Sequence, residues 1–162
     1  LIDADGLNAI AECGTTILKA ARGPMVLTPH PGEMARLLGF STAEVNANRI
    51  SAARRLVEMT GAVVLLKGAR SIIASPAGTV MINSSGNAGM ATPGMGDVLS
   101  GIVGALLGQK IPAAAALTLG VYIHGYAADR LAQQMGPYGF LAGDLADELP
   151  ATVADLLSAK AV

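Results

Sequence analysis

The sequence predicts an α/β domain with a mainly parallel sheet flanked by helices. The apolar run AVVLL (62–66) is typical of a central strand that is covered on both faces. Segments with helical periodicity alternate with such strands, which favours parallel pairing. The runs RSIIAS (70–75) and TVMIN (79–83), joined by PAG, predict one hairpin. We see no repeat or linker and expect the chain, residues 1–162, to belong to one domain.

Local signals predict the other elements in order. Pro31 at a first helical position and Gly39 bracket a short helix. Ser41 with Glu44 forms the capping box of a long helix that Gly61 ends. The expected order is a strand end at 1–3, a weak helix at 6–12, a strand at 24–28, helices at 31–38 and 41–59, the strand at 62–66, the hairpin, a glycine-rich loop at 84–96, helices at 97–107 and 112–134, a loop at 136–143, and a final helical segment interrupted near Pro150.

Composition excludes several classes of protein. The formal net charge is −1 and only 3% of residues are aromatic, so the chain lacks the basic and stacking surface that nucleic acids require. The longest apolar runs, 98–108 and 111–123, are too short to cross a membrane. The single Cys13 fits a reducing compartment, and no signal peptide is visible. We therefore expect a cytoplasmic protein that binds neither nucleic acid nor membrane.

The stretch ATPGMGDVLSG (91–101) places one acid behind two glycines at the start of a helix. Gly94 and Gly96 allow backbone amides to approach an anion closely, and the helix N-terminus attracts negative charge. Asp97 in the first turn could then accept a proton from a hydroxyl that attacks phosphorus. The alternative is an N-cap aspartate that only satisfies backbone amides.

Two further motifs follow predicted strands. TPHPGE (28–33) offers His30 and Glu33 where open α/β sheets bind ligands. LLKGARS (65–71) offers Lys67 for a phosphate and Gly68 for its close approach. Each side chain could instead be solvated, or complement a helix dipole, when taken alone. Three such motifs in one small domain favour a phosphate-handling site.

The motifs together resemble one known family. DADGLN, LTPHPGEMARLLG, VVLLKGARS, GMATPGMGD and GFLAGDLADELP occur here in the order seen in the ADP-dependent NAD(P)H-hydrate dehydratases. In bifunctional nicotinamide-nucleotide repair enzymes these form the carboxyl-terminal domain, which has the ribokinase-like fold. The resemblance covers nearly the whole chain, and the combination of motifs is specific, although Gly-x-Gly-Asp is shared with ribokinase-like kinases.

The resemblance implies an activity and roles for particular residues. Hydrated NADH or NADPH would be dehydrated with consumption of ADP (or ATP) and Mg²⁺, by phosphoryl transfer to the hydrate hydroxyl and loss of phosphate. His30 would contact the hydrated nucleotide, and Asp97 would contact its hydroxyl and act as the base. A homo-oligomer is expected. The residues that would bind the adenine nucleotide are Lys67, Gly68, Ala69, Arg70, Ser71 and Gly96, and those that would help to hold Mg²⁺ are Asp3, Asp5 and Glu33.

One departure from the family pattern keeps alternatives open. Family domains carry earlier strands and a glycine-rich segment before the DAD motif, so we expect this chain to lack the N-terminal part of the domain. One alternative is a ribokinase-like kinase for a vitamin precursor, which would leave a stable phosphoester. The other is a non-catalytic nucleotide-binding fragment, which would bind nucleotide without turnover.

Overall fold

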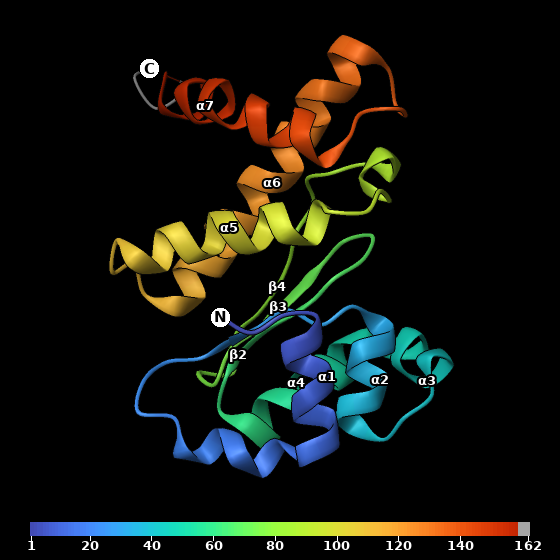
Figure 1. The fold of residues 1–162 in the computed structure, drawn as a ribbon, viewed down its shortest axis with the longest axis vertical. Coiled ribbons are helices and arrows are strands. Elements are labelled where there is room, and N and C mark those ends of the chain that lie inside the picture. Colours follow the sequence, from blue (N-terminus) through green and yellow to red (C-terminus); the bar gives the residue numbers. More distant parts are fainter. Residues whose placement is uncertain (159–162) are drawn as a thin grey trace.

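The computed structural model describes residues 1–158 as a small central sheet between two groups of helices (Figure 1). Helices α1 to α4 lie on one side of the sheet, and α5 to α7 lie on the other. The elements, in which η marks a 3₁₀ helix, are α1 (Asp5–Cys13), η1 (Thr15–Ala20), β1 (Val26–Leu27), α2 (Pro31–Leu38), α3 (Thr42–Ala47), α4 (Arg49–Thr60), β2 (Val63–Leu66), β3 (Ile72–Ala74), β4 (Val80–Ile82), η2 (Ala88–Met90), α5 (Met95–Gly108), α6 (Ala113–Met135) and α7 (Ala142–Ser158).

The sheet has the strand order β1-β2-β3-β4 and is mixed. β1 pairs with β2 in parallel, and Ile2 adds a parallel bridge to Leu27. β3 and β4 form the predicted hairpin, and β3 runs antiparallel to β2. The described sheet is therefore mixed rather than mainly parallel, because parallel pairing is confined to Ile2, β1 and β2. The α/β class and the flanking helices are as predicted.

Alternate residues of β2 face opposite sides of the sheet, and all four are buried. Val64 and Leu66 belong to the core that α1, α2 and α4 cover. Val63 and Leu65 belong to the core formed with α5 and α6. This arrangement confirms the prediction of a strand covered on both faces, since successive side chains point to opposite sides of a strand.

The prediction of a single helix over 41–59 is wrong, because the helical conformation is interrupted at Asn48. The capping box of Ser41 and Glu44 is present, but it begins the short α3. Asn48 has φ −144° and ψ 68°, which is not helical, and its side-chain oxygen accepts a hydrogen bond from Ser51 N–H at 3.3 Å. Asn48 therefore ends α3 and caps α4, and it fixes the start of α4 at Arg49.

The three C-terminal helices follow the prediction with two changes. α5 begins at Met95, two residues before the expected start, so the Gly-x-Gly-Asp motif runs into its first turn. α7 continues through Pro150 instead of being interrupted there. Pro150 is exposed, while Leu145 and Thr152 are buried on either side of it in the sequence. Packing of α7 against α6 thus holds a helix that the proline would otherwise weaken. Across residues 1–158, no helix combines the length and the apolar run needed to cross a bilayer.

Candidate active site

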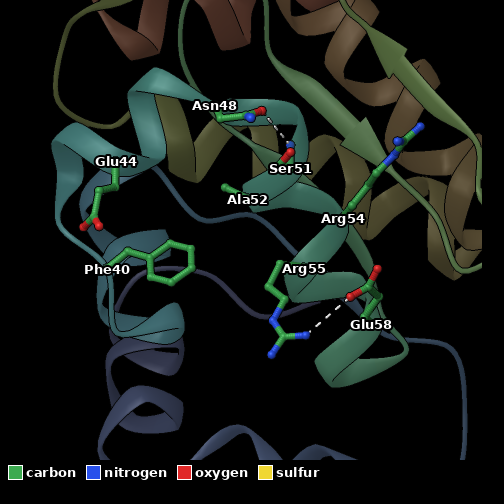
Figure 2. Close-up of a pocket in the computed structure, with 8 residues that line it drawn as sticks. All are labelled: Phe40, Glu44, Asn48, Ser51, Ala52, Arg54, Arg55 and Glu58. Carbon is green, nitrogen blue, oxygen red and sulfur yellow. Dashed lines mark hydrogen bonds and ion pairs between the residues drawn. The ribbon is translucent and has the colours of Figure 1, made fainter.

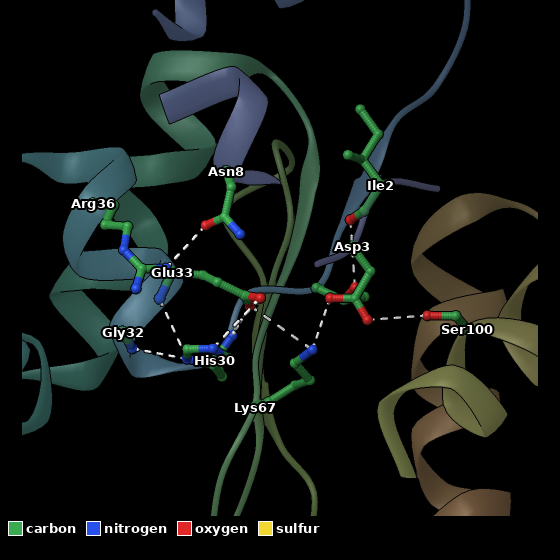
Figure 3. Close-up of polar contacts among 10 residues, drawn as sticks. Ile2, Asp3, Asn8, His30, Gly32, Glu33, Arg36, Lys67 and Ser100 are labelled. Atoms are coloured by element: carbon green, nitrogen blue, oxygen red, sulfur yellow. Dashed lines mark hydrogen bonds and ion pairs between the residues drawn. The ribbon is translucent and has the colours of Figure 1, made fainter. Parts of the chain in front are cut away.

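The sheet brings the ends of three neighbouring strand segments to one edge. Thr28 N–H donates to the Ile2 carbonyl at 3.2 Å, and Lys67 N–H donates to the Pro29 carbonyl at 2.9 Å. These bonds continue the parallel pairing beyond β1 and β2. Asp3, His30 and Lys67 therefore lie near one another, each just after the end of its paired segment. The segments that the sequence separates by more than sixty residues therefore meet at one place, as expected for carboxyl ends of parallel strands (Figure 3).

An ion pair lies at the centre of this edge. Lys67 Nζ is 2.7 Å from Asp3 Oδ1 and 3.9 Å from Glu33 Oε2. The second oxygen of Asp3 accepts a hydrogen bond from Ser100 Oγ at 3.1 Å, which ties α5 to the strand ends. The Lys67 side chain is 21% exposed, so its ammonium still reaches solvent. An ammonium has three donors, and these carboxylates leave it able to meet a further anion.

His30 and Glu33 cap α2 reciprocally. His30 Nδ1 accepts from the Gly32 N–H at 2.9 Å and the Glu33 N–H at 3.3 Å, and Glu33 Oε2 accepts from the His30 N–H at 2.8 Å. Histidine is an unusual N-cap residue, so the sequence pattern does not predict this capping role for His30. Because Nδ1 is an acceptor here, the neutral ring carries its proton on Nε2. The ring is half exposed, so it caps the helix and still presents an edge to the site.

The glycine loop before α5 abuts the same ion pair. Gly94 is the N-cap of α5 with φ +89°, a conformation that favours glycine. A Cβ at Gly96 would lie 3.6 Å from both Asp3 Oδ2 and Lys67 Nζ, so glycine leaves that place open. Among the described residues the Gly96 N–H has no acceptor. The loop thus offers a free amide beside an ammonium, which fits a phosphate oxygen.

Asp97 is the third residue of α5, and its carboxylate is exposed. No hydrogen bond or ion pair links this carboxylate to another residue of the 1–158 segment. Gly94 occupies the N-cap position without a side-chain cap, so the alternative that Asp97 caps the helix is wrong. The carboxylate is therefore free to accept a proton from a ligand.

The predicted nucleotide loop follows β2. Gly68, Ala69 and Arg70 are exposed, and Ser71 Oγ donates to the Gly68 carbonyl at 3.0 Å. Gly68 has φ +139° and Arg70 has φ +54°, so the loop turns sharply. The structure thereby places this loop directly after Lys67 at the same edge of the sheet. Ser100 and Arg49, which contact the strand ends and this loop, were not singled out from the sequence.

The side chains as placed do not fit a magnesium ion. The carboxylates of Asp3 and Glu33 both face the Lys67 ammonium, which supplies the positive charge between them. Asp5 is exposed in the first turn of α1. Within residues 1–158 there is no group of three His, Cys, Asp or Glu side chains that could hold a metal. The role of these three carboxylates toward Mg²⁺ stays a prediction.

A separate groove of about 400 Å³ lies between α4, α3 and the segment that joins α2 to α3 (Figure 2). Phe40, Arg54 and Arg55 line it, and none of the predicted site residues does. Its charged side chains are exposed, and Arg55 pairs with Glu58 at 3.5 Å. This groove is therefore distinct from the edge where the strand ends meet.

The small sheet between two groups of helices, with the glycine-rich start of α5 beside the strand ends, is typical of ribokinase-like proteins, and solved structures agree. An ADP/ATP-dependent NAD(P)H-hydrate dehydratase from Bacillus subtilis, co-crystallized with ATP and Mg²⁺, superposes with a TM-score of 0.79 at 33% identity, over 82% of this chain and 48% of that one. A ribokinase-like superfamily protein from Enterococcus faecalis superposes with a TM-score of 0.80 at 28% identity, over 95% of this chain and 51% of that one.

The family follows from the sequence comparisons. A family model described as NAD(P)H-hydrate dehydratase matches residues 1–151, so the chain belongs to this family, and the resemblance is confirmed. A bifunctional NAD(P)H-hydrate repair enzyme from Moorella thermoacetica is 50% identical over 156 residues, which are 96% of this chain and 29% of that protein. An ADP-dependent (S)-NAD(P)H-hydrate dehydratase from Neisseria meningitidis is 46% identical over 149 residues, or 90% of this chain and 50% of that protein. The chain thus spans half or less of these relatives.

Proposed function

We propose that this chain carries the phosphoryl-transfer part of an ADP-dependent dehydratase that returns hydrated NADH or NADPH to NAD(P)H. One observation carries the proposal: an unpaired Asp97 carboxylate adjoins the free amide of Gly96, which abuts the Lys67–Asp3 ion pair. Family membership supplies the reaction class, and the relatives named above include an enzyme of this name. The proposal includes the assignment of hydrated NAD(P)H as substrate and ADP as donor.

The chemistry assigns one task to each group. The nucleotide supplies the phosphoryl group that makes the hydrate oxygen a leaving group. Lys67 and the Gly96 amide would hold the transferred phosphate through its oxygens, since both are donors and the helix dipole favours an anion. Asp97 would take the proton of the hydrate hydroxyl as its oxygen bonds to phosphorus and the bond from phosphorus to the nucleotide breaks. Phosphate then leaves with the former hydroxyl oxygen, and the adjacent ring carbon loses a proton to water as the double bond of NAD(P)H forms.

His30 would contact the hydrated nucleotide. Its Nδ1 is already engaged in capping α2, and its Nε2 lies 3.5 Å from Glu33 Oε1, so the substrate would meet the Nε2 edge beside this carboxylate. Since Nε2 carries the proton in the neutral ring, His30 would act as a hydrogen-bond donor there. The helix cap also fixes the plane of the ring, so this donor needs no ordering when substrate binds.

The test is Asp97→Asn in the complete gene product. Asparagine keeps the size of the side chain but cannot accept the proton, so turnover should fall by about 10²- to 10⁴-fold. The melting temperature should hardly change, because the Asp97 carboxylate makes no hydrogen bond within residues 1–158. Recovery of NADH absorbance from its hydrate with ADP or ATP measures turnover. Asp147→Asn, at another exposed helical aspartate, is the matched control and should retain activity.

The products separate the alternatives. A dehydratase releases free phosphate together with NAD(P)H, whereas a ribokinase-like kinase would accumulate a stable phosphoester. A non-catalytic fragment would bind nucleotide without either product. If the Asp97→Asn protein turned over at the rate of the wild type, the assignment of Asp97 as the base would have to be abandoned.

A further inference from the structure

The guanidinium of Arg49 lies under the loop that follows β2. Nη1 donates to the Ala69 carbonyl at 2.6 Å and to the Arg70 carbonyl at 3.4 Å. Nη2 donates to the Leu66 carbonyl at 3.2 Å and to the Lys67 carbonyl at 3.3 Å. One side chain at the start of α4 therefore collects four backbone carbonyls from the end of β2 and the following loop.

This arrangement sets the direction of the loop's amides. In a trans peptide the C=O and the N–H point to opposite sides, so carbonyls aimed at the guanidinium turn their N–H groups away from it. The four peptides concerned carry the N–H groups of Lys67, Gly68, Arg70 and Ser71. The Lys67 N–H donates to the Pro29 carbonyl. The turn at Ala69 and Arg70 directs the Ser71 N–H toward the Gly68 carbonyl. The Gly68 and Arg70 N–H groups have no acceptor among the described residues, and free backbone donors of this kind bind anions.

Close contact and burial show that Arg49 is fitted to this place. A Cβ at Gly68 would lie 3.0 Å from Arg49 Nη2, so a side chain there would press on the guanidinium. Arg49 Nε is buried and has no hydrogen-bond partner among the described residues, so every hydrogen bond of the guanidinium goes from Nη1 or Nη2 to the end of β2 and the loop. The positive charge behind the loop also favours an anion in front of it.

We propose that Arg49 is a positioning residue of the nucleotide site. It holds the 67–71 loop so that the amides of Gly68 and Arg70 face the phosphate chain of a nucleoside diphosphate, without itself touching the nucleotide. This proposal rests on the proposed function in one respect: the loop is taken to bind the phosphates of the donor nucleotide.

The test compares Arg49→Met and Arg49→Lys with Arg54→Met in the complete gene product. Arg54 is an exposed arginine on the same helix and serves as the matched control. The KM for ADP should rise about tenfold or more in Arg49→Met, while the KM for the hydrate stays within about twofold. Arg49→Lys should show a smaller rise, because one ammonium cannot span four carbonyls as the guanidinium fork does. Arg54→Met should match the wild type in both constants.

Calorimetry of ADP binding keeps the two proposals separable. If the wild-type protein binds ADP but does not dehydrate the hydrate, the proposed function fails. The Arg49 proposal is then still decided by comparing the ADP affinities of the variants with that of the wild type. Equal rises of both KM values, or an unchanged ADP affinity in a folded Arg49→Met or Arg49→Lys protein, would show that Arg49 only stabilises the fold. Absence of ADP binding by the wild type would overturn the proposal outright.

Discussion

Acidification should weaken the fold through His124, which lies in the middle of α6. The residue is 6% exposed, and its Nε2 is buried without a hydrogen-bond partner within the described chain. Burial lowers the pKa of His124 from 6.5 to about 4, and contact with the Met95 backbone offsets only part of this effect. A charged imidazolium is therefore poorly tolerated inside the helix packing.

The size and the sign of the effect follow from this pKa. The unfolded chain takes up a proton at His124 below pH 6.5, whereas the folded chain does so only below about pH 4. Between these values the unfolded state binds more protons, so the free energy of unfolding falls as the pH falls. A difference of about 2.5 pKa units corresponds to about 3 kcal/mol. This contribution to the free energy of unfolding is fully present above pH 6.5 and lost near pH 4. Its size is a large share of the stability of a typical domain.

His124→Gln isolates the effect, because glutamine is polar, cannot titrate and is of similar size. Urea unfolding of both proteins at several pH values between 7 and 4 gives the two free energies of unfolding. Carboxylate titration is common to both proteins and cancels in their difference. That difference should change by about 3 kcal/mol across the window, in favour of His124→Gln at low pH. Parallel pH profiles for the two proteins would refute the reasoning.

Two further changes test the edge where the strand ends meet. Lys67→Ala should raise the apparent dissociation constant for ADP and leave the protein folded, as measured by calorimetry and thermal unfolding; an unchanged constant would leave Lys67 as a structural partner of Asp3 and Glu33. Gly96→Ala should keep the melting temperature, because the added Cβ would make only ordinary contacts at 3.6 Å. It should nevertheless weaken ADP binding by filling the open place beside the ion pair, and full ADP affinity in this variant would contradict the proposal that a phosphate lies there.

Local chemistry allowed much of this fold to be predicted. The buried run of β2, the hairpin and the Pro31 start of α2 each depend on a signal within a few residues. The break at Asn48 was missed because no proline or glycine marks it, and the capping box of Ser41 favoured one continuous helix. The continuation of α7 through Pro150 depends on packing against α6, which a proline rule does not include.

The site was predictable as a set of motifs and not as a set of contacts. Lys67 is predicted to meet a phosphate, and its ion pair with Asp3, which is 64 residues away in the sequence, carries no signal in either motif. Arg49 was missed because its partners are backbone carbonyls, and no pattern of side chains records them. His30 was expected to meet a ligand, while its role as a helix cap became visible only in three dimensions.

The break at Asn48 gives this part of the chain an uneven tolerance to insertions. Each residue added inside an α-helix turns everything beyond it by about 100°. An extra residue in α3 can be absorbed at the non-helical Asn48, so the phase of α4 is kept. An extra residue between Arg49 and Ala53 would instead turn the guanidinium away from its carbonyls, or turn the buried face of α4 away from the sheet. Length variation among natural or engineered homologues should therefore be found before Asn48 and be absent from the turn that follows it.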